Sequence, residues 1–218
     1  MEQTDRKVVS VNVGLPAAVQ HGSQTVMTGI FKSPCEGAVR LGRTGPQGDG
    51  QADLKHHGGP DKAVCVYSQE HYPQWEQQLG RQLGWGAFGE NLTLSGMDEA
   101  SVVIGDRYRC GEALLEVSQP RQPCFKLGLR HAEPKMTLWV QESGRTGFYL
   151  RVVEEGEAAA GMALELVHRP EHGMTVAEAN RIYYTAKKDA RAIRSLLAVP
   201  ELADSWRNAL AARLEALS

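Results

Sequence analysis

The sequence lacks several features that would place the protein in a membrane, outside the cell or on nucleic acid. No apolar run approaches the length of a membrane-spanning helix. The first seven residues are polar and charged, which predicts the absence of a secretory signal. The formal net charge is only −2, so the charge balance gives no reason to expect a nucleic-acid or membrane partner. We therefore expect a cytoplasmic protein.

Several familiar motifs are also missing. The four cysteines are scattered and none forms a CxxC pair, which predicts free thiols in a reducing compartment. The sequence has no P-loop, no dinucleotide-binding fingerprint and no Ser-His-Asp signature. It shows no flavin, haem or iron–sulfur motif either. Any redox chemistry would therefore need a cofactor bound in another way and an external source of electrons.

Short apolar segments punctuated by glycine and proline make up most of the chain. In the first of them, the valines of Val9–Val13 alternate with Ser10 and Asn12, which predicts a half-buried strand. The other expected strands are residues 24–32, 39–41, 63–67, 92–94, 102–104, 108–110, 113–117, 148–153 and 163–167. Two helices are expected between them, at residues 69–83 and 135–143. This pattern favours a mostly β (α+β) fold with a β-barrel-like core decorated by helices.

The character of the sequence changes after Pro170. A capping box at residues 175–178 and an N-cap at Asp189 predict two short helices, and Pro200 is expected to start a third. Apolar residues spaced four apart in the third helix predict a core stripe. We thus expect a β-barrel domain at residues 1–168 and a three-helix domain at residues 169–218. The basic cluster Lys187, Lys188, Arg191 and Arg194 is interpreted as a solvated face.

The stretch from Ser118 to Leu127 is the strongest candidate for chemistry. Pro120 and Pro123 oppose both strand pairing and helix, so Cys124 is expected on a rigid loop or in the first turn of the next element. Arg121 and Lys126 surround it with positive charge, which favours the thiolate. A small buried cysteine in the core is the alternative, and the residues alone leave the two readings open.

A second polar stretch, Lys55 to Lys62, contains two histidines and two glycines. Adjacent histidines on an extended chain point to opposite faces, and no second cluster has zinc-like spacing, which argues against a metal site. Backbone N–H groups at Gly58 and Gly59, with Lys55, Lys62 and a histidine, would suit an anion. A plain tight turn explains the glycines equally well.

The third polar stretch is Gly89-Glu90-Asn91, whose side chains are expected to hydrogen-bond their own turn. Lys32, Arg40 and Arg43 would either add positive charge around a phosphate or face solvent. Each of the three polar stretches follows or precedes an expected strand. We therefore expect them to gather around one pocket.

Four motifs, taken in order, resemble the MOSC-domain family. They are His56 to Val64, Phe88 to Leu92, Ile104-Gly105-Asp106 and Pro120 to Leu127. The helical tail is similar to the domain that ends one bacterial branch, which includes proteins conferring resistance to 6-N-hydroxylaminopurine. The resemblance implies a β-barrel-like fold and the molybdenum cofactor, molybdopterin, with no need for pyridoxal phosphate.

The resemblance also implies roles for individual residues. Cys124 matches the cysteine that ligates molybdenum in related enzymes, which makes it the catalytic candidate, and thiolates suit such a centre. Arg121, Lys62 and the turn at His57 would hold the phosphate and pterin. The full set of implied cofactor-binding residues is Arg121, His57, Gly58, Gly59, Asp61, Lys62, Asn91 and Lys126.

The implied activity is a two-electron reduction of N-hydroxylated bases to amines, with an external flavin or iron–sulfur reductase as electron donor. One alternative is a carrier that holds a persulfide or the cofactor on Cys124. Another is a cysteine hydrolase using Cys124 with His56 or His57, although no third group to orient the histidine is apparent. The oligomeric state stays open, a homodimer being one option.

Overall fold

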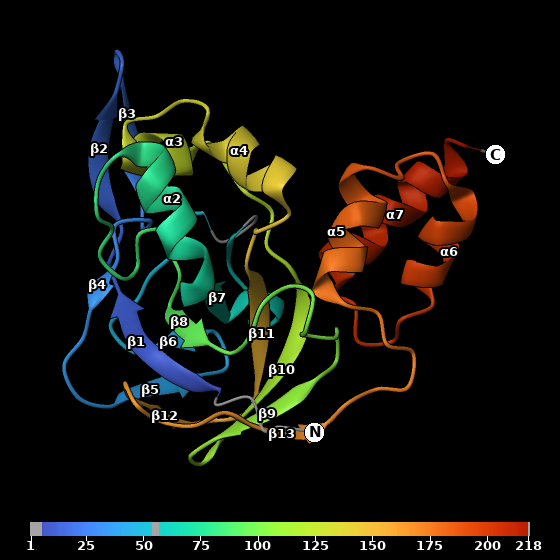
Figure 1. Ribbon diagram of the computed structural model, residues 1–218, viewed down its shortest axis with the longest axis horizontal. Helices are drawn as coiled ribbons and strands as arrows, with labels where there is room; N and C mark the ends of the chain where they lie inside the picture. The colour runs from blue at the N-terminus through green and yellow to red at the C-terminus, as the bar shows by residue number, and fades with distance from the viewer. Residues whose placement is uncertain (1–5, 54–56, 218) are drawn as a thin grey trace.

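The computed structural model describes residues 6–53 and 57–217. Its core is one mixed sheet curved into a half-barrel (Figure 1). The strand order is β13 (Glu165–His168), β9 (Arg107–Cys110), β10 (Ala113–Pro120), β11 (Phe148–Glu154), β7 (Val64–Ser68), β8 (Leu92–Ser95), β1 (Lys7–Val13) and β4 (Ser33–Pro34). Two smaller sheets join β12 (Gly156–Ala158), β5 (Val39–Gly42) and β6 (Gly45–Pro46), and β2 (Ala17–His21) with β3 (Gln24–Thr28). The predicted mostly β fold is confirmed.

The central strands are buried along their whole length, because elements cover both faces of the sheet. All residues of β7, β8 and β10 are buried. In β1 the burial differs from the predicted alternation, because Ser10 and Asn12 are buried and Val9 is only half-buried. Their polar atoms are satisfied internally, since Ser10 Oγ donates to Asn12 Oδ1 (2.8 Å) and Asn12 Nδ2 donates to Thr93 Oγ1 (3.1 Å). The half-buried pattern predicted for this strand is therefore wrong at these positions.

Helices cover one end of the half-barrel. They are η2 (Gln69–His71), α2 (Tyr72–Leu79), α3 (Lys126–His131) and α4 (Met136–Ser143), and an aromatic cluster including Tyr67, Trp75 and Phe88 lies beneath them. The first helix ends four residues earlier than predicted. Gly80 adopts a left-handed φ of 65° and its N–H donates to Glu76 O, which terminates the helix.

The carboxyl-terminal helices form a separate cluster beside β10 (Figure 1). They are α5 (Val176–Tyr184), α6 (Ala190–Leu197) and α7 (Asp204–Glu215), called here the helical module. Thr175 and Asp189 cap α5 and α6 as predicted, whereas α7 begins at Asp204 instead of Pro200. Its core includes Ile182, Ile193, Leu196, Trp206 and Leu210, so the predicted stripe is core.

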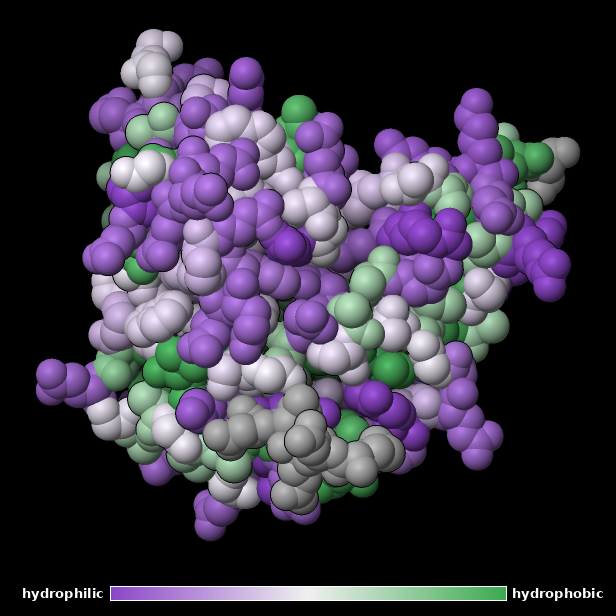
Figure 2. All heavy atoms as spheres, viewed as in Figure 1, coloured by the Kyte–Doolittle hydropathy of each residue, from purple (hydrophilic) through white to green (hydrophobic). Residues whose placement is uncertain are grey.

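The surface seen from the same side is mainly hydrophilic, with small scattered hydrophobic groups (Figure 2). The side chains of Lys187, Lys188, Arg191 and Arg194 are exposed, in agreement with a solvated face. Among the helices of the described residues, none is long and apolar enough to cross a membrane.

Candidate functional site

A pocket opens where the predicted polar stretches meet. Together with the open solvent at its mouth it encloses about 570 Å³. Its walls come from β7, from the segments after β3 and β6, from the turn before β7, and from the loop between β10 and α3. The lining residues are Thr28, Gly29, Ile30, Lys32, Gly50, Gln51, Ala52, Asp53, His57, Lys62, Cys65, Gly89, Asn91, Arg121, Cys124, Lys126 and Tyr149.

Cys124 lies on the short connection between β10 and α3, as predicted. The expectation that Pro120 would oppose strand pairing is wrong, because Pro120 is the last residue of β10 and pairs with Phe148 of β11. Its carbonyl accepts hydrogen bonds from Leu127 N (3.0 Å) and from Thr137 Oγ1 of α4 (2.8 Å). The side chain is half-buried and lines the pocket. The Cys124 backbone is therefore fixed by two hydrogen bonds to its carbonyl, while its side chain lines the cavity.

Arg121 is the charged residue most deeply placed in this wall. Its backbone N–H donates to Gly147 O (3.0 Å), and the residue is only 5% exposed. Nη1 is buried, and no acceptor for it exists among the described residues. A buried guanidinium nitrogen without an acceptor is unfavourable, and an anionic ligand in the pocket would supply one.

Three further basic side chains, His57, Lys62 and Lys126, line the same cavity. Burial, then the positive charges of Lys126 and Arg121, lowers the pKa of His57 to about 4, so the imidazole is neutral at pH 7. Burial also lowers the pKa of Lys62. Burial is the largest cause of both shifts, and for His57 the nearby positive charges add to it, whereas Asp61 and Asp53 partly offset the effect of burial on Lys62.

Some of the sequence-predicted residues lie outside the lining. Lys55 and His56 fall outside the described residues. Gly58, Gly59 and Asp61 are described but do not line the pocket. Gly59 has a φ of 94° and precedes η1 (Pro60–Lys62), with open space where a Cβ would be, so its conformation supports the tight-turn interpretation.

Asn91 lines the pocket but its amide is already occupied. Oδ1 accepts from Cys65 N (3.0 Å), and Nδ2 donates to Asp49 Oδ2 (2.9 Å) and Asn12 O (3.3 Å). Asp49 also pairs with Lys32. Asn91 therefore shapes the floor of the pocket. Neighbouring Glu90 accepts from Gly86 N and Phe88 N (both 3.0 Å), as the turn interpretation predicted.

The other basic candidates lie elsewhere. Arg40 pairs with Glu155 (2.7 Å), and Arg43 N donates to the same carboxylate (3.1 Å). Several lining residues were not predicted, among them Cys65 and Tyr149, and neither was Asp49, which lies outside the lining as a buried partner of Lys32. An aspartate between two glycines in a long loop was an available signal for Asp49. Cys65 and Tyr149 sit in apolar strands, where sequence gives no sign of a cavity.

The half-barrel, the thiol on the loop and the appended helices together define a known class of protein. A family model described as the MOSC domain matches residues 53–165, and one described as the YiiM-like, 3-alpha helix domain matches residues 174–217. The chain belongs to the MOSC-domain family, so the resemblance predicted from the four motifs is confirmed.

Individual relatives agree with this assignment. YflK of Bacillus subtilis (strain 168) is 50% identical over 207 residues, covering 95% of this chain and 94% of YflK. The crystal structure of YiiM from Geobacillus stearothermophilus has a TM-score of 0.82 and 38% identity, covering 96% of this chain and 99% of that chain. A protein named reductase from Gibberella moniliformis (strain M3125 / FGSC 7600) is 36% identical over 161 residues, 72% of this chain and 28% of that protein. Most of that reductase lies outside the match.

Proposed function

We propose that the protein is a molybdenum-cofactor-dependent oxidoreductase that reduces N-hydroxylated bases and related compounds, such as 6-N-hydroxylaminopurine, to the corresponding amines. The observation that carries the proposal is the buried Arg121 guanidinium, whose Nη1 has no acceptor among the described residues of a pocket that also holds a thiol. An anion and a thiophilic centre are the two things this arrangement suits.

The residues fit the cofactor on chemical grounds. MOSC domains are associated in general with binding of the molybdenum cofactor, which carries a phosphate and a metal. Arg121 and Lys62 would hold the phosphate, with Lys126 adding positive charge at the same wall. The neutral ring of His57 can both donate and accept a hydrogen bond, which suits a pterin edge. Cys124 would supply a sulfur ligand to the metal.

The proposed reaction converts R–NHOH, two electrons and two protons into R–NH₂ and water. When bound, the cofactor supplies the two-electron exchange that removes the hydroxyl oxygen. The protein positions the reacting partners. Cys124 is presented from a loop whose carbonyl is tied to α3 and α4, which fixes the direction from which the thiol reaches the pocket.

An external flavin or iron–sulfur reductase would return the two electrons. The reductase-named relative supports this part of the proposal, since the region similar to this chain makes up only 28% of it and leaves room for a donor region. A reducing cytoplasm would suit the free thiols predicted from the sequence.

Protein purified from cells that make the molybdenum cofactor tests the proposal. We expect molybdenum in wild-type protein and turnover of 6-N-hydroxylaminopurine with an artificial electron donor. We expect Cys124→Ala to fold with unchanged thermal stability, because the residue lies on a loop, and to lose at least about 1,000-fold in turnover. Full activity in this variant contradicts the ligand role. Transfer of sulfur or cofactor to an acceptor, without turnover, favours the carrier function instead.

A further inference from the structure

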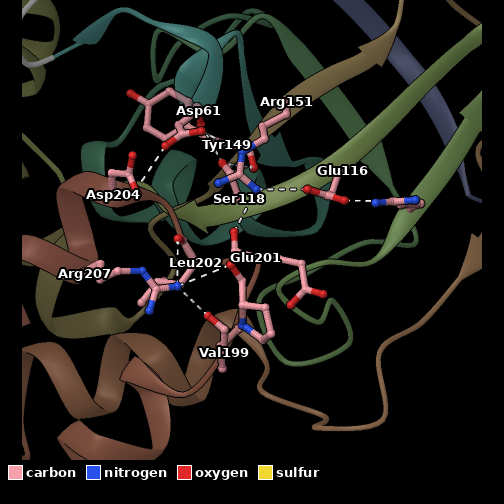
Figure 3. Close-up of polar contacts among 12 residues, drawn as sticks. Asp61, Glu116, Ser118, Tyr149, Arg151, Val199, Glu201, Leu202, Asp204 and Arg207 are labelled. Atoms are coloured by element: carbon pink, nitrogen blue, oxygen red, sulfur yellow. Dashed lines mark hydrogen bonds and ion pairs between the residues drawn. The ribbon is translucent and has the colours of Figure 1, made fainter.

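A polar network joins the helical module to η1. It lies on the side of η1 that faces away from the pocket. Figure 3 shows Arg151 of β11 at its centre, pointing toward Asp61, Glu116 and the carbonyl of Glu201. Arg151 Nε donates to Asp61 Oδ1 (2.6 Å), and Nη1 donates to Glu116 Oε1 (3.0 Å) and Glu201 O (2.7 Å). One guanidinium thus joins the sheet, η1 and the segment that leads into α7.

Asp61 connects this network to the part of the pocket lining that contains Lys62, called here the Lys62 wall. Asp204 N at the start of α7 donates to Asp61 Oδ2 (3.2 Å), and Ser118 Oγ donates to Asp61 O (2.6 Å). Both carboxylate oxygens of Asp61 are therefore engaged away from the cavity. The next residue, Lys62, lines the cavity. Because neighbouring residues in a 3₁₀ turn cannot move independently, holding Asp61 also fixes the position from which Lys62 reaches in.

Residues 201–205 also contact the part of the lining that contains Arg121, called here the Arg121 wall. Ala203 N donates to Ser118 O (3.0 Å), and Ser205 Oγ donates to Gln119 Oε1 (2.9 Å). Arg121 follows Gln119 by two residues. Residues 201–205 therefore contact both the Lys62 wall and the Arg121 wall, which are 59 positions apart in the chain (121 − 62 = 59).

A second connection from the helical module reaches Arg121 from α5. Asn180 Nδ2 donates to Thr146 Oγ1 (2.8 Å), and Thr146 Oγ1 donates to Gly147 O (2.9 Å). Gly147 O is also the acceptor of the Arg121 backbone N–H (3.0 Å). Two helices of the module thus act on the backbone that presents the guanidinium.

We infer that the helical module, through Arg151 and residues 201–205, sets the separation of Lys62 and Arg121 and so determines how tightly the pocket holds an anion. Arg151 is a positioning residue in this scheme, since its guanidinium is used by Asp61, Glu116 and Glu201. The inference rests on the proposed function only in treating the pocket as a phosphate site. It gives the carboxyl-terminal helices a role in that site.

Pyrophosphate is a suitable probe, and its binding is followed as protection of the Cys124 thiol against iodoacetamide, with each cysteine quantified by peptide mass spectrometry. We expect Arg151→Lys, whose single ammonium cannot reach all three acceptors, to raise the half-protecting pyrophosphate concentration about tenfold. Ser205→Ala removes one hydroxyl from an exposed position and is expected to raise it about threefold.

Arg107→Lys is the matched control, because Arg107 pairs with the other oxygen of Glu116 (Nε to Oε2, 2.7 Å) without contacting Asp61 or the helical module. We expect its half-protecting concentration to equal that of wild type. Hydrogen exchange gives a readout without ligand: peptides covering residues 57–63 should exchange about tenfold faster in Arg151→Lys and at the wild-type rate in Arg107→Lys.

The outcomes separate the inference from the proposed function. If pyrophosphate protects wild type and Arg151→Lys equally, or if residues 57–63 exchange equally, the positioning role is wrong while the function stands. A purely structural role predicts this result, with a lower free energy of unfolding and an unchanged half-protecting concentration. Failure of pyrophosphate to protect wild type overturns both. If protection shifts as expected but protein from cofactor-making cells contains no molybdenum and does not turn over N-hydroxylated bases, the inference is supported and only the function is contradicted.

Discussion

Arg121 and Arg151 are both largely buried beside residues of η1, yet their surroundings differ. Arg151 donates to two carboxylates and a carbonyl, whereas Arg121 Nη1 has no acceptor among the described residues. The Arg151 side chain keeps 22% of its exposure, and the more deeply buried Arg121 residue keeps 5%. The cation with less access to water is thus the one with fewer partners. A stable fold alone gives no reason for this combination.

The difference separates structural charge from charge held for a ligand. On the side facing the helical module, positive and negative groups are matched within the chain, so this side is complete without a ligand. On the pocket side, Arg121, Lys62 and Lys126 gather near a neutral His57. Asp53 also lines the pocket and acts electrostatically on His57 and Lys62, whereas Arg121 Nη1 has no acceptor among the described residues.

Replacing each arginine by methionine should give opposite results. We expect Arg151→Met to lower the free energy of unfolding by about 3 kcal/mol, because Asp61 loses its ion-pair partner. Arg121→Met removes an unpartnered buried charge, so we expect stability to be unchanged or to rise by about 1 kcal/mol. In the same Arg121 variant, the pyrophosphate concentration that half-protects Cys124 should rise by at least about 100-fold. Urea unfolding and the alkylation assay measure the two quantities.

The contrast fails if both variants are destabilised to the same extent. That outcome would mean that Arg121 has an internal partner, for instance among the residues outside the described ranges. Arg107→Met serves as a control for the loss of one partner of Glu116, since Arg151 still pairs with that carboxylate.

Acid should distinguish a histidine that lines the pocket from a buried histidine outside it. Burial first, and nearby positive charge among the further causes, lowers the pKa of His57 and of His131 to about 4. In the unfolded chain both titrate near 6.5, so between pH 6.5 and pH 4 the unfolded state binds more protons and the free energy of unfolding falls as the pH is lowered. We expect a contribution on the order of 1 kcal/mol from each, reduced by partial exposure.

Unfolding curves between pH 4.5 and pH 7.5 measure this slope in wild type, His57→Gln and His131→Gln. Each variant should have a shallower slope than wild type. Pyrophosphate should flatten the contribution of His57 alone, because a bound anion raises the pKa of a histidine in the pocket. His131 donates from Nε2 to Ala87 O (3.0 Å) and is not a lining residue. An equal effect of pyrophosphate on both variants would contradict the placement of the anion.

Much of the fold follows from local signals in the sequence. Alternation, glycine and proline punctuation and helix caps predicted most of the strands and the three carboxyl-terminal helices. The misses occur where tertiary contacts override the local pattern. Ser10 and Asn12 are buried because Thr93 and their own side chains satisfy them. The strands β2, β4, β6 and β12 were not predicted, and residues 102–104, predicted as a strand, form only an isolated bridge at Val103.

The site was predictable only in part, for a related reason. Pro123 predicted the Cys124 loop because its effect on the backbone is local, whereas Pro120 is still paired at the end of β10. The direction of a side chain is a tertiary property, and it separates Lys62 from Asp61 although they are adjacent in the sequence. Asp61 is engaged by Arg151 and Asp204 N, and Asn91 is occupied by Cys65 N and Asp49. A direct contact of either residue with the cofactor stays a prediction.

The smallest effect is expected at Cys65, which lines the same pocket as Cys124 but lies in β7. Its thiol is buried, and burial raises its pKa, so it is a neutral group against the apolar core. Cys65→Ser introduces a hydroxyl that needs a partner, and we expect a loss of about 1 kcal/mol in stability with turnover within about twofold of wild type. Unchanged thermal stability would remove the reason to treat Cys65 as core. A loss of turnover as large as in Cys124→Ala, with stability intact, would move the reacting thiol from the loop to the strand.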